Sequence, residues 1–126
     1  MRKTIHTDSA PKAIGPYSQA VRVGNLLFTS GQIPLDPKTG ELVQGTIEEQ
    51  ARRVFQNLDA VVKAAGLSFN HVARVGIYLT DLANFAAVNG VMAEFFAEPY
   101  PARSTIGVAS LPKGAQVEVD LVLVSD

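Results

Sequence analysis

The sequence predicts an α+β domain in which two helices cover one face of a mostly antiparallel sheet. Two segments have the apolar period of an amphipathic helix, and short strand-like segments precede, separate and follow them. The order of strands, helix, strand, helix and two strands is typical of this fold class. A length of 126 residues, 47% of them apolar, suits a single domain spanning residues 1–126.

The first strands are predicted at 20–23 and 26–31. These short runs flank Gly24–Asn25, a pair that favours a tight hairpin turn. Further along, Pro37 and Gly40 predict a turn on the surface.

The first helix is predicted over residues 46–66. Thr46 and Glu49 have the spacing of a capping box, which satisfies backbone N–H groups at a helix start. Apolar residues then recur with the helical period at Ala51, Val54, Phe55, Leu58, Val61, Val62 and Ala65. The pattern stops at Gly66, a residue type favoured just after helix ends.

A second helix is predicted within residues 81–98 and ends before Pro99. Gly90 weakens this helix, but the apolar period continues through it. Asn89 falls within the otherwise apolar face, which contains Phe85, Val88, Met92, Phe95 and Phe96.

Three later segments predict strands, one at 72–80 and two within 100–124. The first alternates, so that one side presents Ala73, Val75, Ile77 and Leu79. The last, at 116–124, presents Val117, Val119, Leu121 and Leu123 on one side. Its other side presents Gln116, Glu118, Asp120, Val122 and Val124.

The helices can cover only one face of such a sheet. The other face would expose Val122 and Val124 beside Glu118 and Asp120. That surface is too apolar to leave in water and too charged for an ordinary core. We therefore expect several copies of the chain to pack these faces together, around clefts that hold the polar groups.

Composition and charge argue against nucleic-acid-binding and membrane proteins. The net charge is −1, and no basic cluster is larger than Arg2–Lys3 or Arg52–Arg53. No apolar run approaches the roughly 20 residues of a membrane-spanning helix, and the N-terminus has no apolar segment like that of a signal peptide. There is no cysteine. We expect a cytoplasmic protein with no nucleic-acid or membrane partner.

Motifs for metal and cofactor chemistry are absent from the sequence. The two histidines, His6 and His71, are not in a metal-ligand spacing. No G-x-S-x-G, P-loop or G-x-G-x-x-G motif occurs. We therefore do not expect a zinc site.

Four local clusters remain as candidates for a functional site: residues 15–19, residues 28–35, Asn89, and the pair Arg103 and Glu118. Their structural alternatives are, respectively, a turn, a strand end, a buried amide that caps neighbouring backbone, and an ion pair. The pair is the strongest candidate, because an unpaired charge in an apolar strand is costly.

The motifs G-P-Y-S-Q, F-T-S-G-Q-I-P, P-A-R-S and L-P-K-G-A-x-V-E-V-D occur in this order between Ile14 and Val122, with a helix predicted after Gly45. In this ordered set the chain resembles the Rid family of reactive-intermediate deaminases. The resemblance implies a chorismate-mutase-like α+β fold, a relative of the ferredoxin-like fold. It also implies a homotrimer with a barrel-like core and a site in each cleft between subunits.

The resemblance implies an enzyme that hydrolyses 2-imino and enamine acids, such as 2-aminoacrylate and 2-iminobutyrate, to 2-keto acids and ammonia without a cofactor or metal. Arg103 matches the arginine that binds the substrate carboxylate, and a guanidinium suits this role because it meets both oxygens at once. Glu118 matches the glutamate that activates water as a general base.

Further positions match substrate-binding or pocket-lining residues of the family: Tyr17, Ser30, Gly31, Asn89 and Thr105. Thr105 stands where many members have cysteine, and because backbone groups at this position contact the imine end, we expect the chemistry to be intact. Met92 stands where many members have tyrosine, which we expect to affect only packing at the periphery of the pocket.

Two alternatives come from other functional classes. A non-catalytic ligand-sensing or chaperone-like trimer could use the same carboxylate-binding cleft, and accelerated loss of 2-iminobutyrate would distinguish an enzyme from it. An endoribonuclease or translation inhibitor, an activity attributed to some relatives, is less favoured because the sequence lacks a basic groove and a histidine pair.

Overall fold

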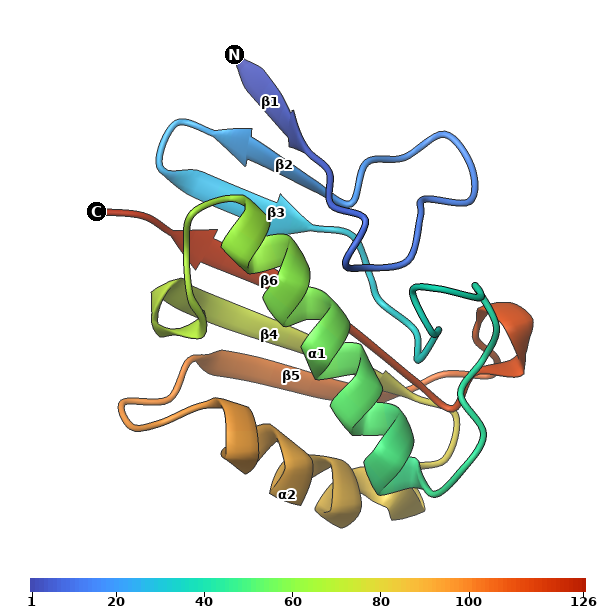
Figure 1. Ribbon diagram of the computed structural model, residues 1–126. Helices are drawn as coiled ribbons and strands as arrows, with labels where there is room; N and C mark the ends of the chain where they lie inside the picture. Colours follow the sequence, from blue (N-terminus) through green and yellow to red (C-terminus); the bar gives the residue numbers. More distant parts are fainter.

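The computed structural model describes residues 1–126 and shows one six-stranded sheet with both α-helices packed on the same face (Figure 1). The strand order across the sheet is β1-β2-β3-β6-β4-β5. The elements are β1 Arg2–Ile5, β2 Ala20–Val23, β3 Leu26–Thr29, α1 Ile47–Ala64, β4 Val72–Leu79, α2 Phe85–Phe95, β5 Ala102–Gly107 and β6 Val117–Val124. Only β4 and β5 are parallel, so the predicted α+β fold with a mostly antiparallel sheet is confirmed.

Strand β1 is an element that the sequence pattern does not predict. It pairs with β2, and Arg2 lies opposite Val23. Its first three residues are exposed and only Ile5 is buried, so the strand has no apolar alternation to detect. By contrast, the turn at Gly24–Asn25 forms as predicted, with Gly24 in the left-handed region at φ 59°.

Helix α1 begins as predicted at a capping box. The Thr46 hydroxyl accepts a hydrogen bond from the Glu49 N–H, and the Glu49 carboxylate accepts one from the Thr46 N–H, each at 3.2 Å. The helix ends at Ala64, two residues before Gly66. Its buried apolar face comprises Ala51, Val54, Phe55, Leu58, Val61 and Val62, six of the seven residues that the periodicity predicts. The seventh, Ala65, is the C-cap and is only partly buried.

Helix α2 is shorter than the predicted segment, and two predictions about its apolar face are wrong. Val88 and Met92 are buried against α1 and the sheet, but Phe85 is 40% exposed and Asn89 is exposed. At the first turn of a short helix, the surface that Phe85 faces is an edge of the sheet and not the core. Asn89 is therefore not a buried amide.

The alternation predicted for residues 72–80 is wrong at Ala73. The pairing of β4 with β6 shifts register between Val72 and Arg74, and this bulge leaves Ala73 exposed. Val72 is buried in its place, and the alternation resumes at Val75. A bulge adds one unpaired residue to a strand, and period-two analysis does not detect it.

The face of the sheet away from the helices, called the open face below, carries no covering element. Strand register places apolar and charged side chains side by side there: Val23, Phe28, Arg74, Tyr78, Ile106, Glu118, Asp120, Val122 and Val124. Phe28 is 43% exposed and Ile106 is 48% exposed. The predicted division of β6 into a buried and a partly exposed side is confirmed. Neither α-helix is long and apolar enough to cross a membrane.

Candidate functional site

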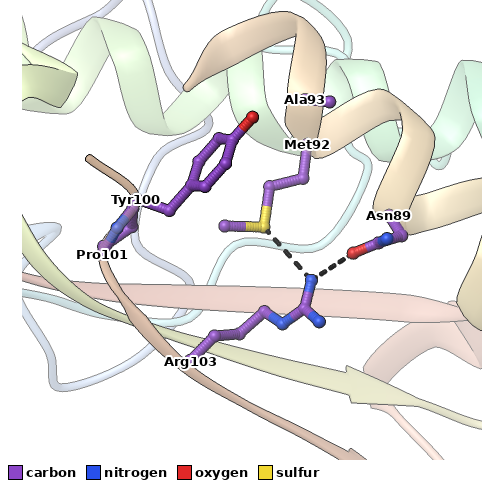
Figure 2. A pocket seen from close by; sticks show the side chains of 6 residues that line it. All are labelled: Asn89, Met92, Ala93, Tyr100, Pro101 and Arg103. Atoms are coloured by element: carbon purple, nitrogen blue, oxygen red, sulfur yellow. Dashed lines mark hydrogen bonds between the residues drawn. The ribbon is translucent and has the colours of Figure 1, made fainter. Parts of the chain in front are cut away.

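Arg103 lies on β5 and extends toward the helix-covered side of the sheet. It is the parallel partner of Val75, a core residue of β4. Figure 2 shows its guanidinium directed at α2, where Nη1 donates a hydrogen bond to Asn89 Oδ1 and lies 3.7 Å from Met92 Sδ. The guanidinium carbon also lies 5.2 Å from the centre of the Phe85 ring, within range of a cation–π interaction. Three side chains of α2 therefore orient this cation.

A cleft of about 450 Å³ opens beside Arg103 (Figure 2). It is lined by Asn89, Met92, Ala93, Tyr100, Pro101 and Arg103. The three ion pairs of the chain all involve other residues, so no carboxylate lies within 4 Å of the Arg103 guanidinium. Its remaining N–H groups can receive a carboxylate from a ligand. Met92 lines this cleft and contacts the arginine directly.

Glu118 lies on β6, on the open face, opposite Tyr78 of β4. Its carboxyl group stands directly over Gly31, where a Cβ would lie 2.8 Å from the carboxyl carbon. With the carboxyl group in this position, only glycine at residue 31 avoids a collision with it. A second cleft, of about 180 Å³, lies beside this carboxyl group and is also bordered by Lys12 and Tyr17.

The surroundings of Glu118 raise the pKa of its carboxyl group above the ordinary value. Partial burial is the larger cause, because it disfavours the charged form, and the negative charge of Asp120 adds to it. The arginine of the first cleft does not offset this effect, because it lies on the other side of the sheet. A carboxylate with a raised pKa is a stronger base, as water activation requires.

Replacing Glu118 with glutamine is expected to stabilise the fold at neutral pH. Because the pKa of Glu118 is higher in the folded chain than in the unfolded chain, its ionisation costs stability above the folded-state pKa. That cost disappears below the unfolded-state pKa of about 4.3. Thermal unfolding temperatures of Glu118→Gln and wild type should differ at neutral pH and converge near about pH 3. An exposed control, Glu41→Gln, should show no such difference, and a less stable Glu118→Gln at neutral pH would contradict the pKa assignment.

Two predicted residues lie with Arg103. Asn89 accepts its hydrogen bond, and Thr105 lies two residues further along β5, on the same side of the strand. The Thr105 hydroxyl oxygen is buried and has no hydrogen-bond partner. An unsatisfied buried hydroxyl is uncommon in a folded protein.

Three predicted residues lie with Glu118. Tyr17 and Gly31 border the second cleft, and Ser30 precedes Gly31. The Ser30 hydroxyl donates a 2.6 Å hydrogen bond to the Ser18 carbonyl, which ties the end of β3 to the segment carrying Tyr17. These contacts fix the backbone below the Glu118 carboxyl group.

Gln19 has a structural role that no local sequence pattern predicts. Its side chain is buried, accepts a hydrogen bond from the Thr7 N–H at 2.7 Å and donates to the Thr7 and Pro11 carbonyls. It therefore holds the loop that leads to Tyr17. Its place inside the G-P-Y-S-Q motif is the only sequence signal for this role.

Arg103 and Glu118 do not meet within one chain, so the structural ion pair considered for them is not formed. Arg103 lies beside Val75 and Glu118 lies opposite Tyr78, three positions further along β4. Since successive side chains of a strand alternate between faces, the two functional side chains lie on opposite faces of the sheet. A site that used both would need a second copy of the chain. No group of three or more histidine, cysteine, aspartate or glutamate side chains is placed to hold a metal ion.

Comparison with known proteins identifies the family. The sequence model of the family described as Endoribonuclease L-PSP matches residues 7–125. RidA from an Antarctic Psychrobacter is 49% identical, with a TM-score of 0.93 over 97% of this chain and 98% of that one. The chain belongs to the Rid family.

Two further Rid relatives bear on function. A 2-iminobutanoate/2-iminopropanoate deaminase of Dermatophagoides farinae is 48% identical over 123 residues, which cover 98% of this chain and 96% of that one. The structure of E. coli TdcF with bound serine is 44% identical, with a TM-score of 0.93 over 98% of this chain and 99% of that one. The family therefore includes imine deaminases and a protein that binds a small amino acid.

Proposed function

We propose that this Rid protein hydrolyses 2-imino and enamine acids, including 2-aminoacrylate and 2-iminobutyrate, to 2-keto acids and ammonia. The observation that carries the proposal is the guanidinium of Arg103 in one cleft, which pairs with no carboxylate of the chain, and the partly buried carboxylate of Glu118 in another. The deaminase relative supports the reaction, and bound serine in TdcF supports a ligand with a carboxylate and a nitrogen on the next carbon.

In this proposal the site lies between two subunits of a homotrimer and joins Arg103 of one subunit to Glu118 of the partner subunit. The open face supports an assembly, because Phe28, Ile106 and Val124 are exposed there with no element of the chain to cover them. Exposed apolar side chains gathered on one face are typical of an interface. Association would also close each cleft to water.

The proposed chemistry uses two side chains and one water molecule. Arg103 binds the substrate carboxylate and thereby places the carbon of the C=N bond, which is electrophilic once its nitrogen is protonated. Glu118 accepts a proton from water as the oxygen bonds to this carbon. The resulting carbinolamine takes the proton from Glu118 onto nitrogen. As the C–N bond breaks, the Glu118 carboxylate accepts the proton of the carbinolamine hydroxyl, so that the C=O bond of the 2-keto acid forms and ammonia leaves. The departing ammonia then takes this proton as ammonium, which restores the carboxylate. An enamine substrate first tautomerises to the imine.

Supporting roles follow from the contacts of the remaining residues. Asn89 holds the Arg103 guanidinium, and the unpartnered hydroxyl of Thr105 lies on the same side of β5 as Arg103. Ser30 and Gly31 form the floor beneath Glu118, and Tyr17 borders the entrance of that cleft. Met92 packs against the arginine from α2.

Arg103→Lys is expected to weaken the binding of 2-ketobutyrate. Lysine keeps the charge but loses the planar two-pronged geometry. A charge-assisted hydrogen bond contributes about 1.5–3 kcal/mol, so calorimetry should record an affinity lower by about 10- to 100-fold.

Arg52→Lys is the matched control, since Arg52 pairs with Glu94 on the exposed side of the helices. Wild-type affinity in Arg103→Lys would overturn the assignment of the arginine. A wild-type protein that binds the keto acid but does not accelerate imine loss would instead support the ligand-sensing alternative.

A further inference from the structure

A second carboxylate lies next to Glu118 on the open face. Asp120 is two residues further along β6, so its side chain points to the same side of the sheet. Glu118 lies opposite Tyr78 of β4, and Asp120 lies opposite Gly76. The reaction proposed above does not use Asp120.

Two features of β4 hold Asp120 in place. The Tyr78 hydroxyl donates a hydrogen bond to Asp120 Oδ2 at 2.9 Å. Gly76 leaves the space that the carboxyl group occupies, because a Cβ at this position would collide with Asp120 Oδ1. Arg74 approaches the same position but forms no ion pair with Asp120 within 4 Å. The Asp120 carboxyl group is thus held in place by Tyr78, with Arg74 nearby but not in an ion pair with it.

The two carboxyl groups of β6 lie over different glycines. The Glu118 carboxyl group lies over Gly31, and the Asp120 carboxyl group lies over Gly76. Both groups are half-buried, where the repulsion between two like charges is screened less than in water. Repulsion from the fixed Asp120 therefore directs the Glu118 carboxylate toward Gly31 and the cleft beside it.

We propose that Asp120, held by Tyr78, is a positioning residue for the Glu118 carboxylate in imine hydrolysis, an inference that rests on the function proposed above. The fixed charge of Asp120 also contributes, after burial, to the raised pKa of Glu118. The other titratable or charged groups that face this pair from neighbouring elements are Lys12, Tyr17, Arg74 and Tyr78.

Asp120→Asn tests the proposal, because asparagine has nearly the same shape and keeps an acceptor for the Tyr78 hydroxyl. The acid limb of kcat/KM for 2-iminobutyrate should move to lower pH, and the Glu118 carboxyl signal in carbon-13 NMR should titrate at lower pH. At neutral pH we expect kcat to fall by about 2- to 10-fold, well below the ~10²–10⁴ of a lost base, with KM unchanged. Glu118→Gln assigns the NMR signal.

Tyr78→Phe is the second variant. In this variant Asp120 keeps its charge but loses the hydrogen bond from the Tyr78 hydroxyl. The midpoints of the kcat/KM profile and of the NMR titration should therefore both move to lower pH, by less than in Asp120→Asn. If Tyr78 acts through Asp120, the double variant should titrate like Asp120→Asn alone.

Asp126→Asn is the control, since it removes the same charge on the order of 20 Å along the strand direction from Glu118. Unchanged midpoints in Asp120→Asn, or a uniform loss of rate without a shift, would overturn the positioning role. If Asp120→Asn does not fold, unchanged midpoints in Tyr78→Phe overturn it. A wild-type protein inactive toward imines would overturn the proposed function instead, and the NMR titration would still report on Asp120.

Discussion

Glu118→Gln is expected to lower the turnover of 2-iminobutyrate by about 10²–10⁴-fold, the usual contribution of a positioned base. Glutamine occupies nearly the same volume over Gly31 but cannot accept a proton from the attacking water. The affinity for 2-ketobutyrate should stay near that of wild type, because Arg103 is on the other side of the sheet and is unchanged. Steady-state rates with enzymatically generated imine, combined with calorimetry, measure both quantities.

The loss of turnover in this variant is not expected to come from unfolding, because the same substitution should stabilise the fold at neutral pH, and the thermal unfolding temperatures check this. Glu41→Gln, at an exposed position far along the chain, should retain full turnover. Near-normal turnover in Glu118→Gln would show that another group activates the water, and the assigned mechanism would then be wrong.

Two inactive variants, Arg103→Ala and Glu118→Gln, are expected to regain activity when their subunits are mixed. Each proposed site takes its arginine from one subunit and its glutamate from the partner. In a random equal mixture about half of the sites receive a functional arginine and, independently, about half receive a functional glutamate. Activity per site should therefore recover to about one quarter of wild type, measured after joint unfolding and refolding.

A mixture of wild type with Arg103→Ala serves as the control for subunit exchange, because about half of its sites should be active in any arrangement. If this control behaves as expected and the two inactive variants show no recovery, the site does not combine the two residues across subunits. Light scattering that shows a stable monomer of 13.4 kDa would contradict the proposed trimer directly.

Local sequence signals predicted the elements whose stability comes from short-range contacts. The capping box of Thr46 and Glu49 and the apolar period after it located α1 to within two residues of its end. Alternation in β6 correctly assigned Val117 and Leu121 to the core and left Glu118 on the other side. These features depend on neighbours within a few residues, which a single sequence displays.

The errors occur where the decisive contact is distant in sequence. Strand β1 forms because it pairs with β2, although its own residues are mostly exposed. Ala73 is exposed because a bulge shifts the register against β6. Phe85 is exposed beside Arg103, since the first turn of α2 borders an edge of the sheet.

The sequence by itself determined the fold class, both helices, the family motifs and the identity of the candidate residues. Only the tertiary structure decided where Arg103 and Glu118 lie relative to each other. Alternation along a strand assigns faces within that strand but does not relate one strand to the next. Here β4 lies between β5 and β6, and its register with each places the two side chains on opposite faces of the sheet.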